Sequence, residues 1–384
     1  MNFLFIVQGE GRGHMTQAIS FERLLERNGH HLSGVILGKS KRRAVPEFFG
    51  REINAPIHLV ESPNFETDGN QKKISIRKTI LKNSLKLKTF HKSLKAIDQI
   101  VEAKNPDVIL NFYDLLGGLY KFLYRPKALF WVIGHQYLIE HPNFKFAPDK
   151  PLDKLLFRLN TALTSLGADE RLALSFLPQI HFSNQKVRVV PPLLRPEVKL
   201  LIPKTGDFYL AYMVNPGYAE EVIFFANANP HLKIKAYWDK KEAAETEHPL
   251  PNLSFHRVHD KNFLQDMAHC KGLVCTAGFE SVCEANYLGK PVMMIPVAGQ
   301  YEQACNALDA EASGVGIASG NFDFTKLEQM QKKKSYSAHY IKWLIPGKPS
   351  SGNWLQKLSF QSRKAKQFTH RTRSRLWVNA ELAS

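Results

Sequence analysis

The chain has 384 residues, more than one hydrophobic core usually carries, so two domains are expected. With 44% hydrophobic and 23% charged residues the composition is that of an ordinary globular protein, and no apolar run reaches the roughly 18–20 residues that span a bilayer. The formal net charge of +17 instead indicates an anionic partner: nucleic acid, a membrane surface or a phosphorylated substrate.

The amino-terminal stretch MNFLFIVQGEGRGH has no basic n-region and a short apolar run that ends in glycines. It therefore predicts a strand and a turn and not a signal peptide. The four cysteines, Cys270, Cys275, Cys283 and Cys305, form no CxxC pair. We expect buried thiols in a reducing cytoplasm and no metal cluster.

The first third of the chain alternates strand-like and helix-like stretches. Residues 2–8 form a short apolar run, and residues 15–29 place apolar side chains at helical spacing before a glycine stop. Further apolar runs at 30–38, 106–113 and 127–134 predict three more buried strands. Strands that alternate with helices predict a parallel sheet and a doubly wound α/β domain.

A second series of strands follows the proline-rich stretch 189–206, VVPPLLRPEVKLLIPKTG, which is the clearest linker in the chain. We predict a first domain at 1–192, a second at 193–345, and a basic tail at 346–384, for which a return to the first domain is one option. Ligands of open α/β sheets bind beyond the carboxyl ends of the strands, so the loops there are the candidate site. The strand-like runs of the second domain lie at 207–214, 232–238, 253–258, 271–278 and 290–296.

Glycines dominate the loop GEGRGH, where Gly9, Gly11 and Gly13 precede His14 at or near a helix start. Glycines let a backbone approach a ligand, and free helix N–H groups favour negative charge. The spacing is neither the dinucleotide fingerprint nor a P-loop. On its own the loop is equally consistent with a structural turn, and His14 with a cap.

Polar residues stand at the ends of elements between Thr276 and Gly316. A helical pattern starts after Gly278, so Ser281 lies in the first turn, where a hydroxyl and free N–H groups hold a phosphate. Glu284 is one turn on and suits two ribose hydroxyls. A second helix opens with Glu302 and Gln303 and carries Asn306 on the same face, a set that suits a polyhydroxylated ring.

This series resembles the donor-sugar motif of GT-B glycosyltransferases, in particular the UDP-glycosyltransferases and the bacterial family that adds N-acetylglucosamine to a lipid-linked muramyl pentapeptide. The resemblance implies two Rossmann-like doubly wound domains that face each other across a cleft, a UDP-sugar donor and transfer to an acceptor hydroxyl. It implies that Ser281 contacts the diphosphate, Glu284 the ribose, and Glu302 and Gln303 the sugar. The matching residues are, in chain order, Gly278, Ser281, Glu284-Ala285, Gly289-Lys290-Pro291, Glu302-Gln303 and Asn306-Ala307.

The loop with Gly11 and Gly13 also resembles the acceptor-facing Gly-Gly-His loop of these families. Two departures stand out. Asn215-Pro216-Gly217 replaces the usual Gly-Gly-Ser turn, which leaves the donor-phosphate contacts there open. Thr276 stands where retaining families carry a second Glu, which favours an inverting mechanism.

Inverting transfer needs a base for the acceptor proton and groups that stabilise the leaving diphosphate. His14 is the first candidate for the base because an imidazole titrates near neutral pH. Asp114 and His135 are rivals, since each follows a predicted strand, and each has a structural role as its alternative. No Asp-x-Asp sequence occurs, so we expect no metal ion and no cofactor besides the nucleotide-sugar substrate.

Positive charge concentrates in two segments. Segment 72–97 holds nine Lys or Arg and no acid, and fits either a core helix with a basic outer face or a face that docks on anionic lipid through apolar residues such as Phe90. The tail adds six Lys or Arg in QSRKAKQFTHRTRSRLW, which suits phosphates or a disordered end. We expect a lipid or glycan acceptor and a cytoplasmic protein, with peripheral binding to the inner membrane face as an option.

Two other interpretations remain. A nucleotide-sugar epimerase or hydrolase shares the fold, and a basic nucleic-acid-associated protein without enzyme activity shares the charge. No RNA- or DNA-binding module is recognisable, so no nucleic-acid partner is expected.

Overall fold

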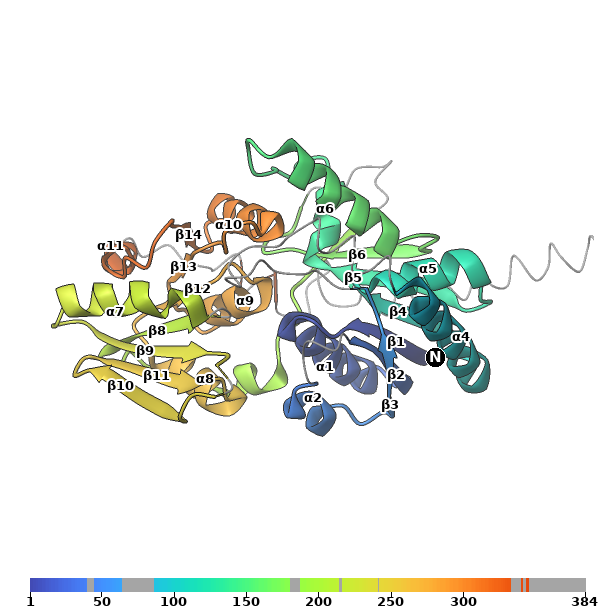
Figure 1. Ribbon diagram of the computed structural model, residues 1–384, viewed down its shortest axis with the longest axis horizontal. Helices are drawn as coiled ribbons and strands as arrows, with labels where there is room; N and C mark the ends of the chain where they lie inside the picture. The colour runs from blue at the N-terminus through green and yellow to red at the C-terminus, as the bar shows by residue number, and fades with distance from the viewer. Residues whose placement is uncertain are drawn as a thin grey trace, which may run out of the picture.

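The protein folds into two α/β domains that lie next to each other (Figure 1). Each is built on a sheet of seven strands with helices on its faces, which confirms the predicted doubly wound architecture. The computed structural model describes residues 1–39, 45–63, 86–179, 187–213, 216–240, 242–332, 340 and 343–344.

The first sheet has the strand order β3-β2-β1-β4-β5-β6-β7, and all of its strand pairs are parallel. Helices cover both faces, so central strands such as β1 are apolar and buried along almost their whole length. The strands are β1 (Asn2–Gln8), β2 (His31–Lys39), β3 (Ile57–Glu61), β4 (Val108–Phe112), β5 (Leu129–Gly134), β6 (Glu170–Leu174) and β7 (Val187–Val190). The helices are α1 (Arg12–Arg27), α2 (Glu47–Glu52), α4 (Leu87–Lys104), α5 (Leu115–Tyr124), η1 (His135–Glu140) and α6 (Pro151–Thr164).

The second sheet has the order β10-β11-β9-β8-β12-β13-β14, and only the edge strand β10 pairs antiparallel. Its strands are β8 (Phe208–Met213), β9 (Lys233–Trp238), β10 (Thr246–Leu250), β11 (Leu253–Arg257), β12 (Leu273–Cys275), β13 (Val292–Met294) and β14 (Ile317–Ala318). The helices are η2 (Pro196–Leu200), η3 (Pro216–Tyr218), α7 (Ala219–Ala228), α8 (Asp260–His269), α9 (Phe279–Tyr287), α10 (Tyr301–Ala312) and α11 (Thr325–Lys332). The first sheet thus ends at Val190, and the second begins at Phe208. The exact domain boundaries remain predictions.

The nine strands expected from apolar runs are all present, but β3, β6, β7, β10 and β14 were not expected. These strands are short, and several carry charged or half-exposed residues. Such segments become strands because a neighbouring strand offers its free backbone groups, which local sequence does not reveal.

A shared hydrophobic cluster joins the two domains. Phe279 at the start of α9 stacks on His135 of the first domain, with ring centroids 4.1 Å apart, and lies 4.6 Å from the Phe176 ring. Beyond α11 the chain touches both sides of this junction. The Tyr340 hydroxyl donates to the Cys283 carbonyl (2.9 Å), and Trp343 Nε1 donates to the Ser175 carbonyl of the first domain (3.1 Å). The tail at 346–384 lies outside the described residues.

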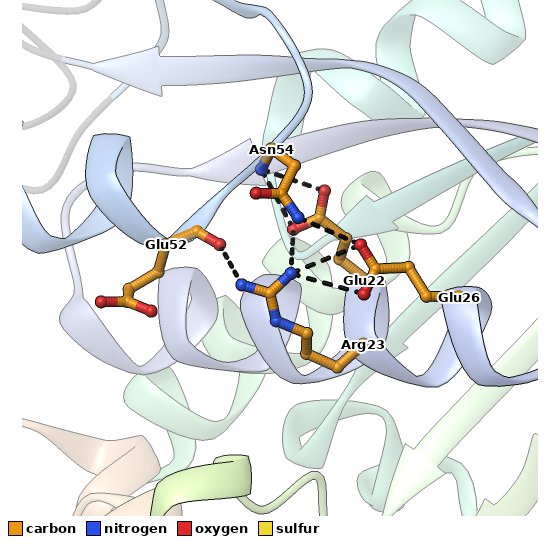
Figure 2. A network of polar contacts seen from close by, with 5 residues as sticks. All are labelled: Glu22, Arg23, Glu26, Glu52 and Asn54. Carbon is orange, nitrogen blue, oxygen red and sulfur yellow. Dashed lines mark hydrogen bonds and ion pairs between the residues drawn. The ribbon is translucent and has the colours of Figure 1, made fainter.

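Helix α1 is fixed to the first domain by the polar network in Figure 2. Arg23 donates to the Glu52 carbonyl (2.8 Å) and pairs with Glu26 (3.3 Å). The Asn54 backbone N–H donates to Glu22 (3.2 Å), and its side chain donates to Glu26 (3.0 Å). These contacts hold the carboxyl half of α1 against the segment after α2, so the other end of the helix is held in place at the domain junction.

Helix α4 contains the described part of segment 72–97, of which residues 72–85 lie outside the described residues. Phe90, Leu94 and Ile97 are buried in the core of the first domain, while Lys88 and Lys92 are exposed. The described part is therefore a core helix with a basic outer face, which is the first of the two alternatives for this segment, and Phe90 packs in the core. Across the described residues, no helix is both long and apolar enough to cross a bilayer.

Candidate functional site

The predicted site residues other than Asp114 gather where the first domain meets the second: α1 contacts α9 through Gln17 and Glu280, and η1 contacts α10 through Gln136 and Glu302 (Figure 1). Each of these helices follows a parallel strand: β1 leads into α1, β12 into α9 and β13 into α10. The carboxyl ends of both sheets therefore contribute loops to one region, as expected for a ligand site in this class of fold. Asn215, which opens the turn that departs from the motif, lies outside the described residues.

His14 lies in the first turn of α1 with 9% of its surface exposed. Its Nε2 is 3.5 Å from the Gln136 amide nitrogen, and its ring stacks on Tyr113 with centroids 5.7 Å apart. Burial lowers the pKa of His14 to about 4, and a hydrogen bond with Gln17 opposes the shift. The imidazole is therefore neutral at pH 7 and, while it stays buried in this way, a weaker base than a free imidazole.

Gln136 connects His14 to the second domain. Its amide nitrogen donates to Glu302 Oε1 (2.9 Å) and faces the lone pair of the His14 ring nitrogen. Burial raises the pKa of Glu302 to about 7, while hydrogen bonds from Gln136 and Asn306 oppose that shift. The sequence could have indicated Gln136 as a site residue, because it follows His135 directly after β5. Only His135 was predicted from that position.

The Glu284 carboxylate forms an ion pair with Arg195 and is not exposed to solvent. Its two carboxylate oxygens accept from Arg195 Nε and Nη2, both at 2.6 Å, in a bidentate ion pair. The Glu284 side chain is 2% exposed and the Arg195 side chain 14%. Burial disfavours the charge on Arg195, but the neighbouring Glu284 raises its pKa. Sequence reasoning missed Arg195 because it lies in the proline-rich linker, which was interpreted only as a connection.

The amino terminus of α9 has no side-chain cap, so its first backbone N–H groups are not satisfied by a capping residue, and Ser281 lies among them. The preceding residue, Glu280, is half-buried and accepts a hydrogen bond from Gln17 of α1. A Cβ on Gly13 would collide with the Glu280 carboxylate, so this glycine makes room for a contact between the domains. A Cβ on Gly11, in contrast, would meet no atom within 4 Å.

Gln303 and Asn306 bond to the loops around the site. Gln303 Oε1 accepts from the Val297 backbone N–H (2.8 Å), and Asn306 Nδ2 donates to the Ala277 carbonyl (3.1 Å). These bonds fix the loops that lead into α10 and α9. The roles of Gln303 and Asn306 as contacts to a sugar remain predictions.

The rival bases have structural partners. Asp114 caps α5 by accepting from the Leu116 N–H (2.9 Å), it accepts from Ser62 (3.0 Å), and burial raises its pKa to about 6. His135 Nδ1 donates to the Leu174 carbonyl (2.8 Å), and its ring packs on Phe279. Of the three candidates, His14 is the one linked by Gln136 to the motif of the second domain.

A cavity of about 520 Å³ adjoins the first loop and is of a size that small-molecule sites have. Gly9, Glu10 and Arg12 line one side, and residues of β9, β11 and α8 line the other. Arg12 spans the two domains, 3.9 Å from Asp239 and 3.5 Å from Asp260. The motif residues Ser281, Glu284 and Glu302 do not line this cavity.

The described part of the chain contains no group of three or more His, Cys, Asp or Glu arranged to hold a metal ion. Cys270, Cys275, Cys283 and Cys305 are all buried thiols outside any disulfide.

Solved structures with similar folds cover nearly the whole chain. UGT2 from Phytolacca americana, solved with UDP-2fluoro-glucose and pterostilbene, is 12% identical with a TM-score of 0.57, over 89% of this chain and 92% of that one. MurG from Acinetobacter baumannii is 14% identical with a TM-score of 0.52, over 94% and 99%. The glycotransferase of kitacinnamycin is 15% identical with a TM-score of 0.56, over 96% and 98%. At these identities the likeness shows the fold, which is GT-B.

The family follows from the sequence itself. No curated protein matches the chain significantly. Residues 1–333, however, match the model of glycosyl transferase family 1, a span that includes both sheets and every predicted site residue. The chain therefore belongs to glycosyl transferase family 1 and is a glycosyltransferase with the GT-B fold.

Proposed function

We propose that the protein transfers a sugar from a UDP-linked donor to an acceptor hydroxyl with inversion at the anomeric carbon. The observation that carries this proposal is the chain of contacts His14–Gln136–Glu302. It brings a neutral imidazole of the first domain next to the residues that resemble a sugar-binding motif in the second. A base and a sugar site from opposite domains are what transfer across a domain junction requires.

In the proposed reaction the donor ribose binds Glu284, and the diphosphate lies at the amino terminus of α9 near Ser281. The acceptor oxygen bonds to the anomeric carbon and gives its proton to the His14 imidazole. The bond between the anomeric carbon and the phosphate oxygen breaks, and its electron pair leaves with UDP. Backbone N–H groups and the dipole of α9 stabilise the charge that develops there.

Thr276 supports inversion. It follows β12 directly and is 2% exposed, at the position where retaining relatives of the motif carry a carboxylate. A threonine hydroxyl does not supply that negative charge. The anomeric configuration of the product, measured by proton NMR before mutarotation, tests this part: retention would refute it.

An apolar or lipid-linked acceptor is proposed from an exposed face of α6. Leu152, Leu155 and Leu159 repeat at helical spacing and are 60%, 61% and 52% exposed. The opposite face of α6 packs Phe157 against Tyr301, 6.2 Å between centroids, so α6 lies next to the residue before Glu302. An exposed leucine row beside a transfer site suits an acceptor with an apolar chain, presented from the cytoplasmic face of a membrane.

Vesicle binding tests the α6 proposal. Leu155→Ser/Leu159→Ser should lose binding to vesicles that contain anionic lipid. Leu200→Ser, at an 82% exposed leucine elsewhere, is the matched control and should keep it. Equal binding by wild type and both variants would show that α6 does not contact lipid.

A thermal-shift series with UDP, dTDP, GDP and ADP tests the donor. UDP should raise the melting temperature most, because a ligand that binds only the folded state stabilises it. No response to any nucleoside diphosphate would refute the proposed function. Incubation with the matching UDP-sugar but no acceptor separates the other enzymes of this fold: release of free sugar indicates a hydrolase, and conversion to an epimeric donor indicates an epimerase.

A further inference from the structure

The chain leaves β4 through Tyr113, a buried residue that neither sequence motif contains. Its ring stacks on the His14 imidazole, with centroids 5.7 Å apart and planes 23° apart. We propose that Tyr113 is a positioning residue for His14. Its ring holds the imidazole in the orientation in which it takes the acceptor proton, and its hydroxyl anchors that ring in α6. This inference rests on the proposed function and adds a residue to the proposed site.

The backbone of Tyr113 has an unusual conformation, with φ at +60°. The other described non-glycine residues with positive φ are Asn105, Arg125 and Asp149, and all three are exposed. Asn105 and Arg125 end helices, where a left-handed residue is common. A bulky buried side chain in the left-handed region is strained, and a fold keeps such strain only where the surrounding contacts over-determine it. Strain of this kind gathers at functional sites, which makes this turn a candidate for one.

Asn111 of β4 holds this turn in place. Its side chain is fully buried, and its Nδ2 donates to the carbonyls of Asp114 (2.9 Å) and Thr164 (2.9 Å). Its Oδ1 accepts from the backbone N–H of Asp114 (3.1 Å). The turn cannot relax without breaking these buried hydrogen bonds, which is costly because each would leave a polar group without a partner. The point from which the Tyr113 ring projects is therefore fixed.

The hydroxyl of Tyr113 anchors the ring in α6. It lies 2.8 Å from Thr161 Oγ1, and because the Thr161 hydroxyl spends its own proton on the Phe157 carbonyl (2.9 Å), Tyr113 is the donor. Tyr137 packs edge-on against Tyr113, with centroids 5.6 Å apart, and donates to Thr164 Oγ1 (3.1 Å) in the same helix. Two tyrosines thus tie this side of the base to α6, the helix with the exposed leucine row.

The phenol of Tyr113 is not itself a base. Burial raises the pKa of Tyr113, and the negative charge of Glu302 adds to the shift, so the hydroxyl keeps its proton at neutral pH. The effect of Glu302 also shows that the ring lies near the sugar motif. Asp114, the next residue, is occupied by Ser62 (3.0 Å) and by the cap of α5. Of these two neighbours, Tyr113 is therefore the one that serves His14, by contact and not by proton transfer.

Removing the ring should slow the chemical step without weakening donor binding. The rate is measured as UDP release from UDP-glucose and UDP-N-acetylglucosamine with n-octanol as the acceptor, and the Kd for UDP by titration calorimetry. Tyr113→Leu should lower kcat by about 10- to 100-fold, the scale of a reacting group displaced by about 1 Å, and leave the Kd unchanged. Tyr113→Phe keeps the ring and should restore most of kcat. Tyr120→Leu is the matched control, at a buried tyrosine of the same domain that bonds to Asp98 (2.9 Å), and should keep the wild-type kcat.

A double-mutant cycle shows whether Tyr113 acts through His14. In a His14→Ala background, Tyr113→Leu should cause no further loss of kcat, because no imidazole is left to position. A further loss of the same size in that background would mean that the ring only supports the fold. Equal losses of kcat and of UDP affinity in Tyr113→Leu alone would mean the same, and either result overturns the inference.

Tyr113→Gly covers the case in which Tyr113→Leu fails to fold, because glycine adopts a positive φ without strain. It removes the ring, and it should give the same loss of kcat and the same result in the cycle. A wild-type kcat in either folded variant overturns the inference and leaves the proposed function standing. A wild-type protein that releases UDP from neither donor overturns both.

Discussion

Burial decides the chemistry of the individual side chains at the junction. His14 is enclosed by Tyr113, Gln136 and α1, and its lowered pKa makes it a neutral base over the whole physiological range. The same burial makes Glu302 a weaker acid with a pKa of about 7. A base and an acid with shifted pKa values in contact with one amide are a common sign of a functional site.

Replacing His14 should affect the chemical step. We expect His14→Ala to lower kcat by about 10²–10⁴, the usual contribution of a general base, and to leave the Kd for UDP nearly unchanged. His231→Ala, at an exposed position before β9, is the matched control. If Asp114→Asn lost most of its kcat while His14→Ala kept the wild-type kcat, Asp114 would be the base.

The pH profile offers a separate check on His14. A base whose pKa is about 4 is deprotonated at every pH above that value, so His14 should add no acid limb near pH 6.5 to kcat/KM. A limb at pH 6.5 that disappears in His14→Gln would show that the pKa of His14 in the working enzyme is not lowered.

The Arg195–Glu284 pair should also be visible in stability. Glu284→Ala leaves a buried guanidinium unpaired and should lower the free energy of unfolding by about 3–5 kcal/mol. In a urea double-mutant cycle, Arg195→Gln/Glu284→Gln should lose less than the sum of its single variants. Glu242→Ala, at an exposed glutamate, serves as the control. Additive losses would mean that the two charges do not depend on each other.

At the scale of elements, the contact between α1 and α9 joins the domains through polar groups. Gln17 donates to Glu280, and Gly13 leaves the space that the Glu280 carboxylate fills. A glycine at the start of α1 is unfavourable for a helix by itself, so its presence here has a packing reason that lies on another helix.

The effect of Gly13→Ala on the stability of the protein should therefore change sign when Glu280 is replaced. In the wild-type background Gly13→Ala should be destabilising by roughly 1–3 kcal/mol, because the methyl group overlaps Glu280. In a Glu280→Ala background the same change should stabilise by about 0.5–1 kcal/mol, the helix preference of alanine over glycine. Urea denaturation of the four proteins measures both, and an unchanged sign would rule out the steric explanation.

For the whole molecule, the junction is a mixed interface of aromatic rings and buried ionisable groups. His135 of the first domain stacks on Phe279, and its Nε2 lies 3.5 Å from Asp309 of α10. Burial raises the pKa of Asp309 to about 7 and lowers that of His135 to about 4. His135 Nδ1 donates to the Leu174 carbonyl, which leaves the other ring nitrogen facing the Asp309 carboxyl across the junction.

Stability should therefore depend on the protonation of Asp309. The folded protein keeps this proton up to about pH 7, whereas the unfolded chain loses it near pH 3.9, so the stabilisation is complete below about pH 4 and lost as pH rises to 7. The unfolding free energy of wild type minus that of Asp309→Asn should fall over this range. This subtraction removes the opposite contribution of His14, whose lowered pKa weakens the fold as pH falls. A difference that stays constant with pH would contradict the raised pKa.

The sequence alone determined the class of fold and the region of the site. Apolar runs separated by helical stretches predicted two doubly wound domains, because a parallel sheet covered on both faces needs nearly continuous apolar strands. The spacing from Gly278 to Asn306 predicted the loops that meet at the junction, because polar residues at strand ends and helix starts have few structural reasons to be there.

Only the tertiary structure decided which residues are partners. Gln136, Arg195 and Glu280 contact residues 166, 89 and 263 positions away along the chain, and no local pattern carries such a pairing. It also decided that Phe90 faces the core and that β6 and β7 are strands, since burial and strand pairing depend on which surface a segment meets after folding. Periodicity and composition act within a segment, whereas pKa shifts, ion pairs and shared cavities arise between segments.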